Sequence, residues 1–126
     1  MLRIKQFDEY RRLTSTAKTH LDREFGFIPN IMKHDIYIEF WEGRKFIGVL
    51  CGDENFNEEL YIEHFLINKK HRRKGYGTEI IKTLKRTYKK ISVEAIETSV
   101  PFWWAMGFKK RKYQSPKYYD TIEMHG

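Results

Sequence analysis

The sequence predicts one domain of the α/β (α+β) class, with helices flanking a mixed, mostly antiparallel central sheet of about six to seven strands. Short apolar runs rich in aromatic and β-branched residues alternate with stretches whose apolar residues recur at helical spacing. The chain has 126 residues, of which 40% are hydrophobic, enough for one core and too few for two. No repeat, low-complexity segment or Pro- or Ser-rich linker divides residues 1–126, so we expect a single domain.

The N-terminal part of the chain predicts a strand, a helix and a hairpin. Residues 2–7 are expected to form the first strand, and Asp8 to cap a helix that continues to about Phe25. Residues 26–30 are expected to end that helix and begin a loop. Two apolar runs on either side of a Glu-Gly-Arg-Lys turn predict the hairpin, over residues 36–41 and 46–51.

The C-terminal part predicts one long helix between strands. A polar turn over residues 52–57 leads to a strand over 60–67. Helical spacing then follows, with one apolar face formed by Tyr76, Ile80, Ile81, Leu84 and Tyr88. A strand at 91–96 and a short helical turn from Pro101 to Gly107 come next. The last two strands are expected to pair with each other, over residues 108–113 and 118–124.

Charge is sorted along the chain. The 24 Lys and Arg against 17 Asp and Glu give a net charge of +7. Residues 69–74 (KKHRRK) carry five cations, whereas residues 53–66 carry five carboxylates and no Lys or Arg. This distribution indicates an anionic ligand near 69–90 and a cationic ligand near 53–63. Two solvated faces of opposite charge are the simpler alternative.

Several classes of protein are excluded by what the sequence lacks. No apolar run approaches the ~18 residues that a membrane span needs, so no membrane partner is expected. The first residues have no signal-peptide pattern, and the single Cys51 cannot form an internal disulfide, so a cytoplasmic protein is expected. The five histidines show no metal-ligand spacing, and we expect no metal.

The most informative segment joins the strand at 60–67 to the helix that follows, and residues 72–77 read RRKGYG. A helix N-terminus leaves backbone N–H groups unpaired and carries partial positive charge, so it attracts phosphate. Gly75 and Gly77 allow the backbone to approach an anion closely. Three cations precede or flank these glycines and add charge-assisted hydrogen bonds: Arg72, Arg73 and Lys74. A pyrophosphate site is therefore predicted, with an ordinary basic turn as the alternative.

Residues 72–77 resemble motif A of the GNAT superfamily of N-acetyltransferases, Q/R-x-x-G-x-G/A between a strand and a helix. Residues 102–108 (FWWAMGF) resemble the family's F-Y-x-x-x-G-F segment, which follows the next strand. The resemblance implies a GNAT-like fold and an acyl-CoA N-acyltransferase of the acetyltransferase type. Such an enzyme transfers an acetyl group from acetyl-CoA, its cosubstrate, to a primary amine of a small molecule or protein by direct attack on the thioester.

The resemblance also implies which residues bind acetyl-CoA. Backbone groups of the motif-A strand would pair with the pantetheine as an added strand does, and loop amides would hold the pyrophosphate. An N–H near Phe65 or Leu66 would polarise the thioester carbonyl. The implied cofactor-binding residues are Phe65, Leu66, Ile67, Arg72, Arg73, Lys74, Gly75, Tyr76, Gly77, Thr78 and Trp103.

Two positions depart from the family in ways that affect the chemistry. Trp103 aligns with a tyrosine that often protonates the departing thiolate, and an indole is no useful acid. Trp103 is therefore expected to pack either along the cofactor or in the core, and Tyr113 or Tyr118 are possible substitute acids. The position that holds a glutamate base in some members aligns with Tyr61.

A base is still needed, because an amine must lose a proton before it attacks. Strand alternation is expected to place Tyr61, Glu63 and Phe65 on one face, with Ile62, His64 and Leu66 on the other. Glu63, one step from Tyr61 along that face, is the best candidate catalytic residue, and Tyr61 is the second. A solvated or ion-paired Glu63 is the alternative, and His64 is expected to be a packing residue.

Other functions stay open because both usual catalytic residues are replaced. One is a non-catalytic CoA-binding protein, and another is a basic nucleic-acid-binding module, which the motifs do not favour. For the enzyme, the acidic segment favours a cationic amine acceptor. Exposed sheet edges also allow a homodimer.

Overall fold

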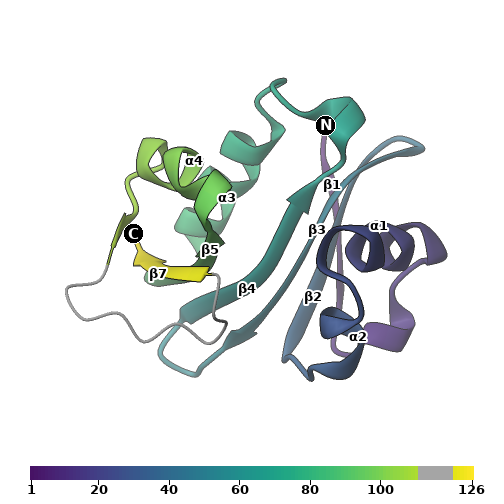
Figure 1. The fold of residues 1–126 in the computed structure, drawn as a ribbon, viewed down its shortest axis with the longest axis horizontal. Coiled ribbons are helices and arrows are strands. Elements are labelled where there is room, and N and C mark those ends of the chain that lie inside the picture. The colour runs from purple at the N-terminus through teal and green to yellow at the C-terminus, as the bar shows by residue number, and fades with distance from the viewer. Residues whose placement is uncertain (111–120) are drawn as a thin grey trace.

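A single seven-stranded sheet organises the computed structural model, which describes residues 1–110 and 121–126 (Figure 1). Its strand order is β1-β2-β3-β4-β5-β7-β6, and all neighbouring strands are antiparallel except β4 and β5. The predicted mixed, mostly antiparallel sheet is confirmed. The strands are β1 Arg3–Phe7, β2 Ile36–Glu42, β3 Lys45–Glu54, β4 Glu59–Ile67, β5 Lys90–Ile96, β6 Lys109–Lys110 and β7 Thr121–His125.

Helices cover both faces of the sheet. The helices are α1 Ser15–Phe25, α2 Ile28–Ile31, α3 Tyr76–Thr87 and α4 Val100–Ala105. In Figure 1, α1 and α2 lie at the right and α3 and α4 at the left. The larger core joins α3 and α4 to one face through residues such as Ile38, Ile80 and Trp103. A smaller core joins α1 to the other face, where Ala17 and Leu21 are fully buried. No helix among the described residues is both long and apolar enough to cross a membrane.

The first helix begins later than the sequence indicates. Asp8 does not cap it, because residues 10–12 form a separate 3₁₀ turn and α1 starts at Ser15. Thr14 is the N-cap, and its hydroxyl accepts a hydrogen bond from the Ala17 N–H. The buried Glu39 carboxylate on β2 accepts from both the N–H and the hydroxyl of Thr14, at 2.7 and 3.1 Å. A long-range contact therefore decides where this helix begins.

Two segments expected to be irregular are partly ordered into elements. The short helix α2 forms within and just beyond the expected loop at 26–30. Strand β3 continues to Glu54, into the expected polar turn. The last two strands pair as predicted over their described part, Lys109 with His125 and Lys110 with Met124, and β7 lies between β5 and β6. Tyr113 and Tyr118 lie outside the described residues.

A β-bulge interrupts β4 at Glu63. Across from β3, Cys51 pairs with His64 and Gly52 pairs with Ile62, so Glu63 is the extra residue. The bulge resets the alternation, because Ile62 and Phe65 both pack in the larger core while Leu66 belongs to the smaller one. The prediction that Leu66 shares a face with Ile62, and that Phe65 lies on the opposite one, is therefore wrong.

Strands β4 and β5 pair only at their starts. Their parallel ladder joins residues 59–62 to residues 90–93 and ends there, one residue before the bulge. Beyond Val93, β5 stays paired with β7, while β4 stays paired with β3. In Figure 1, β4 runs up and to the right, away from β5 and β7. The second half of β4 thus presents its backbone along an edge that β5 does not cover.

Candidate active site

A cavity of about 990 Å³ opens where β4 and β5 part. It is lined by the second half of β4, the loop after it, the start of α3, part of β5 and the aromatic residues of α4. The fold brings the predicted cofactor-binding residues together here, with Lys74 alone not among the lining: Phe65, Leu66, Ile67, Arg72, Arg73, Gly75, Tyr76, Gly77, Thr78 and Trp103.

The start of α3 borders this cavity, and its backbone has the turn that the sequence predicts for an anion site. Gly75 is the N-cap and has a left-handed backbone with φ of 86°. The first helical hydrogen bond runs from the Glu79 N–H to the Gly75 carbonyl at 3.0 Å, so the N–H groups of the preceding turn are left to a ligand. Arg73, with φ of 63°, supplies a second left-handed turn just before it. Both turns lie in the wall of the cavity.

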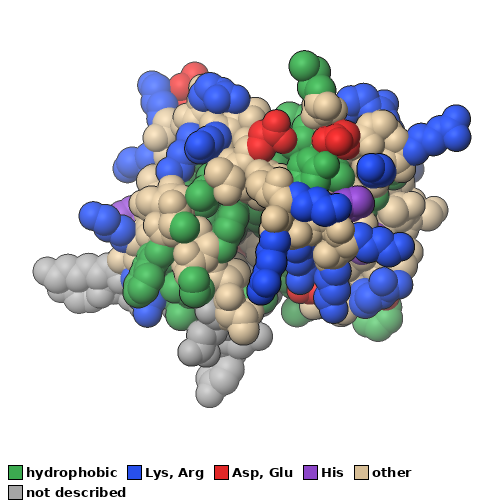
Figure 2. Space-filling view, turned by 90° about the horizontal axis from the view of Figure 1, so that it is seen from above, with side chains coloured by type: hydrophobic (Ala, Val, Ile, Leu, Met, Phe, Trp, Pro, Cys, Tyr) green, Lys and Arg blue, Asp and Glu red, His purple; other side chains and the backbone are tan. Residues whose placement is uncertain are grey.

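Arg72 fixes the loop to its surroundings. Its Nε donates to the Ile67 carbonyl at 2.8 Å, and its Nη2 lies 3.7 Å from a carboxylate oxygen of Glu24 on α1. The guanidinium thus ties the end of β4 to the loop, and the Ile67 carbonyl already accepts a hydrogen bond. Arg73 and Lys74 are exposed. Lys and Arg side chains gather over much of the face seen in Figure 2.

Trp103 lies in the core and also forms part of the cavity wall. Only 3% of it is exposed, and its ring centroid lies 5.8, 5.1 and 5.0 Å from those of Phe65, Phe102 and Phe108. Trp103 therefore packs in the core, and its contact with the cofactor stays a prediction that its place in the cavity wall allows. Phe102, which the sequence did not single out beyond its motif, lies between Trp103 and the start of α3.

Two buried carboxylates flank the point where the strands part. Glu63 lines the cavity, and its side chain is 1% exposed. Glu94 of β5 lines it too and accepts a hydrogen bond from the Tyr61 hydroxyl. Burial, followed by this bond, raises the pKa of Tyr61 well above its usual range, which keeps the phenol protonated. Glu94 was not predicted from the sequence, although a carboxylate within the apolar run at 91–96 could have indicated a site residue.

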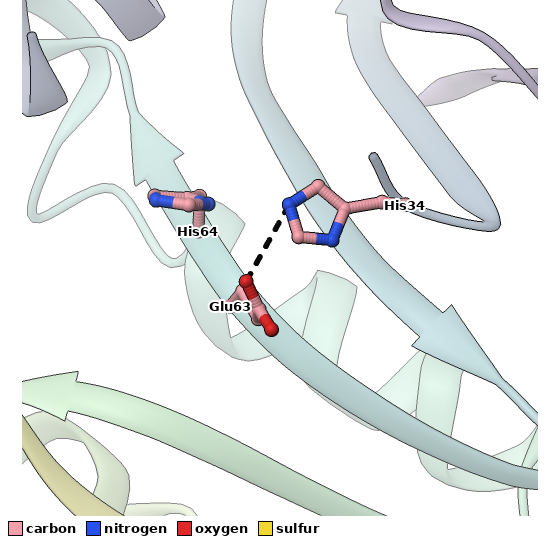
Figure 3. Close-up of side chains that lie close together, drawn as sticks. All are labelled: His34, Glu63 and His64. Atoms are coloured by element: carbon pink, nitrogen blue, oxygen red, sulfur yellow. Dashed lines mark ion pairs between the residues drawn. The ribbon is translucent and has the colours of Figure 1, made fainter. Parts of the chain in front are cut away.

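Glu63 also belongs to a group that only the fold could reveal. Nε2 of His34 lies 3.5 Å from the Glu63 carboxylate, and Nδ1 of His34 lies 3.5 Å from that of Asp53. His64, buried against Phe25, completes the group. Figure 3 shows His34, Glu63 and His64 converging from the loop before β2 and from β4. Their ligand atoms lie within 4.8 Å of one another, so these three could share a metal ion.

Several carboxylates of the acidic segment form hydrogen bonds or ion pairs with distant parts of the chain. Glu54 accepts a hydrogen bond from the Tyr88 hydroxyl at 2.6 Å, and Glu58 lies 3.8 Å from Lys89. Asp53 accepts from the Asp35 N–H at 3.0 Å. Within residues 53–63, Glu63 alone contributes to the described lining of the cavity. The charge run seen in the sequence is therefore mainly structural.

Solved structures share this architecture at low sequence identity. An acetyltransferase from Bacillus subtilis in complex with CoA aligns with a TM-score of 0.72 and 13% identity, over 99% of this chain and 97% of that one. ElaA from Escherichia coli aligns with a TM-score of 0.67 and 14% identity, over 99% of each. The ribosomal-protein-S18-alanine N-acetyltransferase from Escherichia coli gives 0.62 and 16%, over 99% and 92%. No curated protein sequence matches the chain.

A sequence model of the Acetyltransferase (GNAT) family matches residues 4–108. That range includes all of β1 except its first residue, and all of β2 to β5, the glycine-bearing loop, α3 and α4. It contains both segments on which the resemblance rests. The chain belongs to the GNAT family of acetyltransferases, and it is an acyl-CoA N-acyltransferase.

Proposed function

We propose that the protein transfers an acetyl group from acetyl-CoA to a primary amine by direct attack on the thioester. The observation that carries this proposal is the cavity between β4 and β5, where an anion-binding helix start and a buried carboxylate border the same space. The single buried Cys51 fits a protein that works in the reducing cytoplasm.

Acetyl-CoA would lie along the uncovered edge of β4. The pantetheine would pair with backbone groups near Phe65 and Leu66, and the pyrophosphate would meet the N–H groups from Gly75 to Thr78. Arg73 and Lys74 would add positive charge from the loop. A backbone N–H of β4 would then stabilise the oxyanion of the tetrahedral intermediate.

Glu63 is the proposed base. The ammonium group first loses one proton to this carboxylate, directly or through water, and the neutral nitrogen then forms a bond to the thioester carbonyl carbon. As the tetrahedral intermediate collapses, the C–S bond breaks and the nitrogen loses its second proton to water or to the departing thiolate. The thiolate needs no protein acid, since a thiol pKa of ~8.5 makes it a tolerable leaving group. Tyr61 is proposed as a positioning residue, because its hydroxyl holds Glu94 beside the same space.

The acceptor is a cationic amine of a small molecule or a protein. Two buried carboxylates line the cavity beside apolar side chains such as Phe25 and Ile28, which suits an ammonium group on an apolar stem. One similar structure is named as an N-acetyltransferase of a ribosomal-protein alanine, so a protein N-terminus belongs in the same test.

Release of the CoA thiol with a panel of amines tests this proposal. The panel contains a diamine, an arylalkylamine and a peptide with a free N-terminal alanine. Glu63→Gln should lower kcat by ~100-fold or more and change its pH profile. Glu59→Gln, on the same strand but outside the cavity lining, is the matched control and should leave both unchanged. Turnover by Glu63→Gln that is unchanged across pH 6–9 would remove Glu63 from the mechanism.

A further inference from the structure

Three potential metal ligands converge beside the cavity, and two of them, Glu63 and His64, line it. His34 comes from the loop before β2, while Glu63 and His64 come from the bulge in β4. All three residues are buried, and their ligand atoms lie within 4.8 Å of one another. His34 Nε2 lies 3.5 Å from Glu63 Oε2. Two ligand atoms of a tetrahedral Zn²⁺ with metal–ligand bonds of ~2.05 Å lie ~3.4 Å apart, so the two distances agree.

His34 is oriented as a ligand imidazole usually is. Its Nδ1 faces the Asp53 carboxylate at 3.5 Å, the outer partner that fixes the ring and its tautomer in many metal sites. Its backbone N–H donates to the Tyr37 hydroxyl at 3.0 Å, which anchors the loop. Nε2, on the other side of the ring, points at Glu63 (Figure 3).

Nε2 of His34 is a second, independent indication of a bound group. This atom is buried and makes no hydrogen bond to the residues that the structure describes. Buried side-chain nitrogens rarely stay in that state, and such a case calls for an ion or ordered water.

An ion can reach this position. Glu63 and His64 both line the cavity, so the buried group borders the space in which acetyl-CoA and the amine are proposed to bind. Three protein ligands leave a fourth position open for water, as in open zinc sites rather than in closed structural ones with four protein ligands. Two imidazoles and a carboxylate favour Zn²⁺ or Co²⁺ over Mg²⁺ or Ca²⁺.

We propose that His34, Glu63 and His64 bind one divalent transition-metal ion, with Asp53 orienting His34. The metal site is argued from geometry alone. Its effect on activity rests on the proposed function, in which Glu63 is the base. A metal ion and a proton compete for the same Glu63 oxygen, so the bound ion inhibits acetyl transfer, and removal of the ion makes the Glu63 carboxylate available to the amine again.

Titration of the chelator-treated chain with Co²⁺ and Zn²⁺, without CoA or amine, tests the site. We expect one ion per chain and the strong visible absorption of four-coordinate Co²⁺, which Zn²⁺ displaces. His34→Gln and His64→Gln should weaken binding by at least ~10-fold, as should the milder Asp53→Asn. His125→Gln, an exposed histidine on β7, is the control and should bind as the parent does.

Binding only at millimolar metal, or binding that His34→Gln and Asp53→Asn leave unchanged, would overturn the proposal. Thermal melting of each variant shows whether it is folded, and Asp53→Asn provides the test if a histidine variant does not fold. In a separate assay, Zn²⁺ should inhibit acetyl transfer reversibly, and His34→Gln should lose that inhibition. Stoichiometric binding without inhibition would overturn the regulatory consequence and count against Glu63 as the base. An absence of any acetyl transfer would contradict the proposed function alone.

Discussion

Phe102 lies directly against Gly77: a Cβ added to the glycine would stand 3.1 Å from Cε1 of the ring. These residues belong to the two segments that resemble the family's motifs, Gly77 in the first turn of α3 and Phe102 in α4. Their contact packs the start of α3 onto the aromatic residues of α4, beside the cavity. Gly77 is therefore needed because it lets the Phe102 ring pack closely, whereas Gly75 is needed for its left-handed backbone conformation.

Gly77→Ala should lower the free energy of unfolding by about 1 kcal/mol, because overpacking costs ~1–3 kcal/mol and better helix propensity returns at most ~1 kcal/mol. Urea denaturation measures the change. Phe102→Leu makes room for the new methyl group, so the double variant should recover about 1 kcal/mol relative to additivity. Strict additivity would show that the two residues do not press on each other.

Gly75→Ala should destabilise the protein by about 1–2 kcal/mol, because φ of 86° is unfavourable for any residue with a Cβ. Gly43 is a matched control, since its φ is 60° and a Cβ there also meets nothing within 4 Å. Both alanine variants should lose similar stability in urea. Only Gly75→Ala should raise the KM for acetyl-CoA, because Gly43 lies in the β2–β3 turn, outside the cavity lining. An equal KM effect in both would contradict a loop that binds the cofactor.

Arg72→Gln should weaken acetyl-CoA binding by ~10-fold, because it removes the hydrogen bond that holds the loop to the Ile67 carbonyl. The free energy of unfolding should fall by less than the free energy of binding. Lys69→Gln removes one exposed positive charge from the same loop and is the control. Calorimetric titration with CoA compares the two. If charge alone mattered, both variants would weaken binding equally.

Trp103→Ala should lower the free energy of unfolding by ~3–5 kcal/mol, as expected for a large aromatic side chain that is 3% exposed. Trp103→Phe preserves an aromatic ring among Phe65, Phe102 and Phe108 and should retain acetyl transfer within a few-fold. Retained activity follows because the indole donates no proton to the thiolate. A large loss of kcat in a fully folded Trp103→Phe would instead give Trp103 a direct role.

Local signals in the sequence were enough for most of the fold. The apolar spacing from Tyr76 to Tyr88 and the runs at 36–41 and 46–51 predicted α3, β2 and β3 with small errors at their ends. The start of α1 was wrong because Glu39, 25 residues beyond Thr14, holds the true N-cap. No local pattern reports a contact of that range.

The site was predicted in part for the same reason. The loop and helix start at 72–78 are contiguous in sequence, so their residues could be identified before the fold was known. The bulge at Glu63 depends on how β4 pairs with β3 around Gly52, where a Cβ would overlap the Tyr61 carbonyl oxygen. His34 joins Glu63 only after β2, β3 and β4 are assembled, so spacing along the chain gave no metal-ligand signal.

Thermal stability with acetyl-CoA, free CoA and a short DNA duplex, at low and near-physiological salt, tests the central claim most directly. At ~100 times Kd, acetyl-CoA should add about 2.7 kcal/mol, a rise of several degrees that survives the higher salt. Gly75→Ala should show a smaller rise. No rise with acetyl-CoA or CoA, together with a salt-sensitive rise with DNA, would contradict the account and leave a basic nucleic-acid-binding domain.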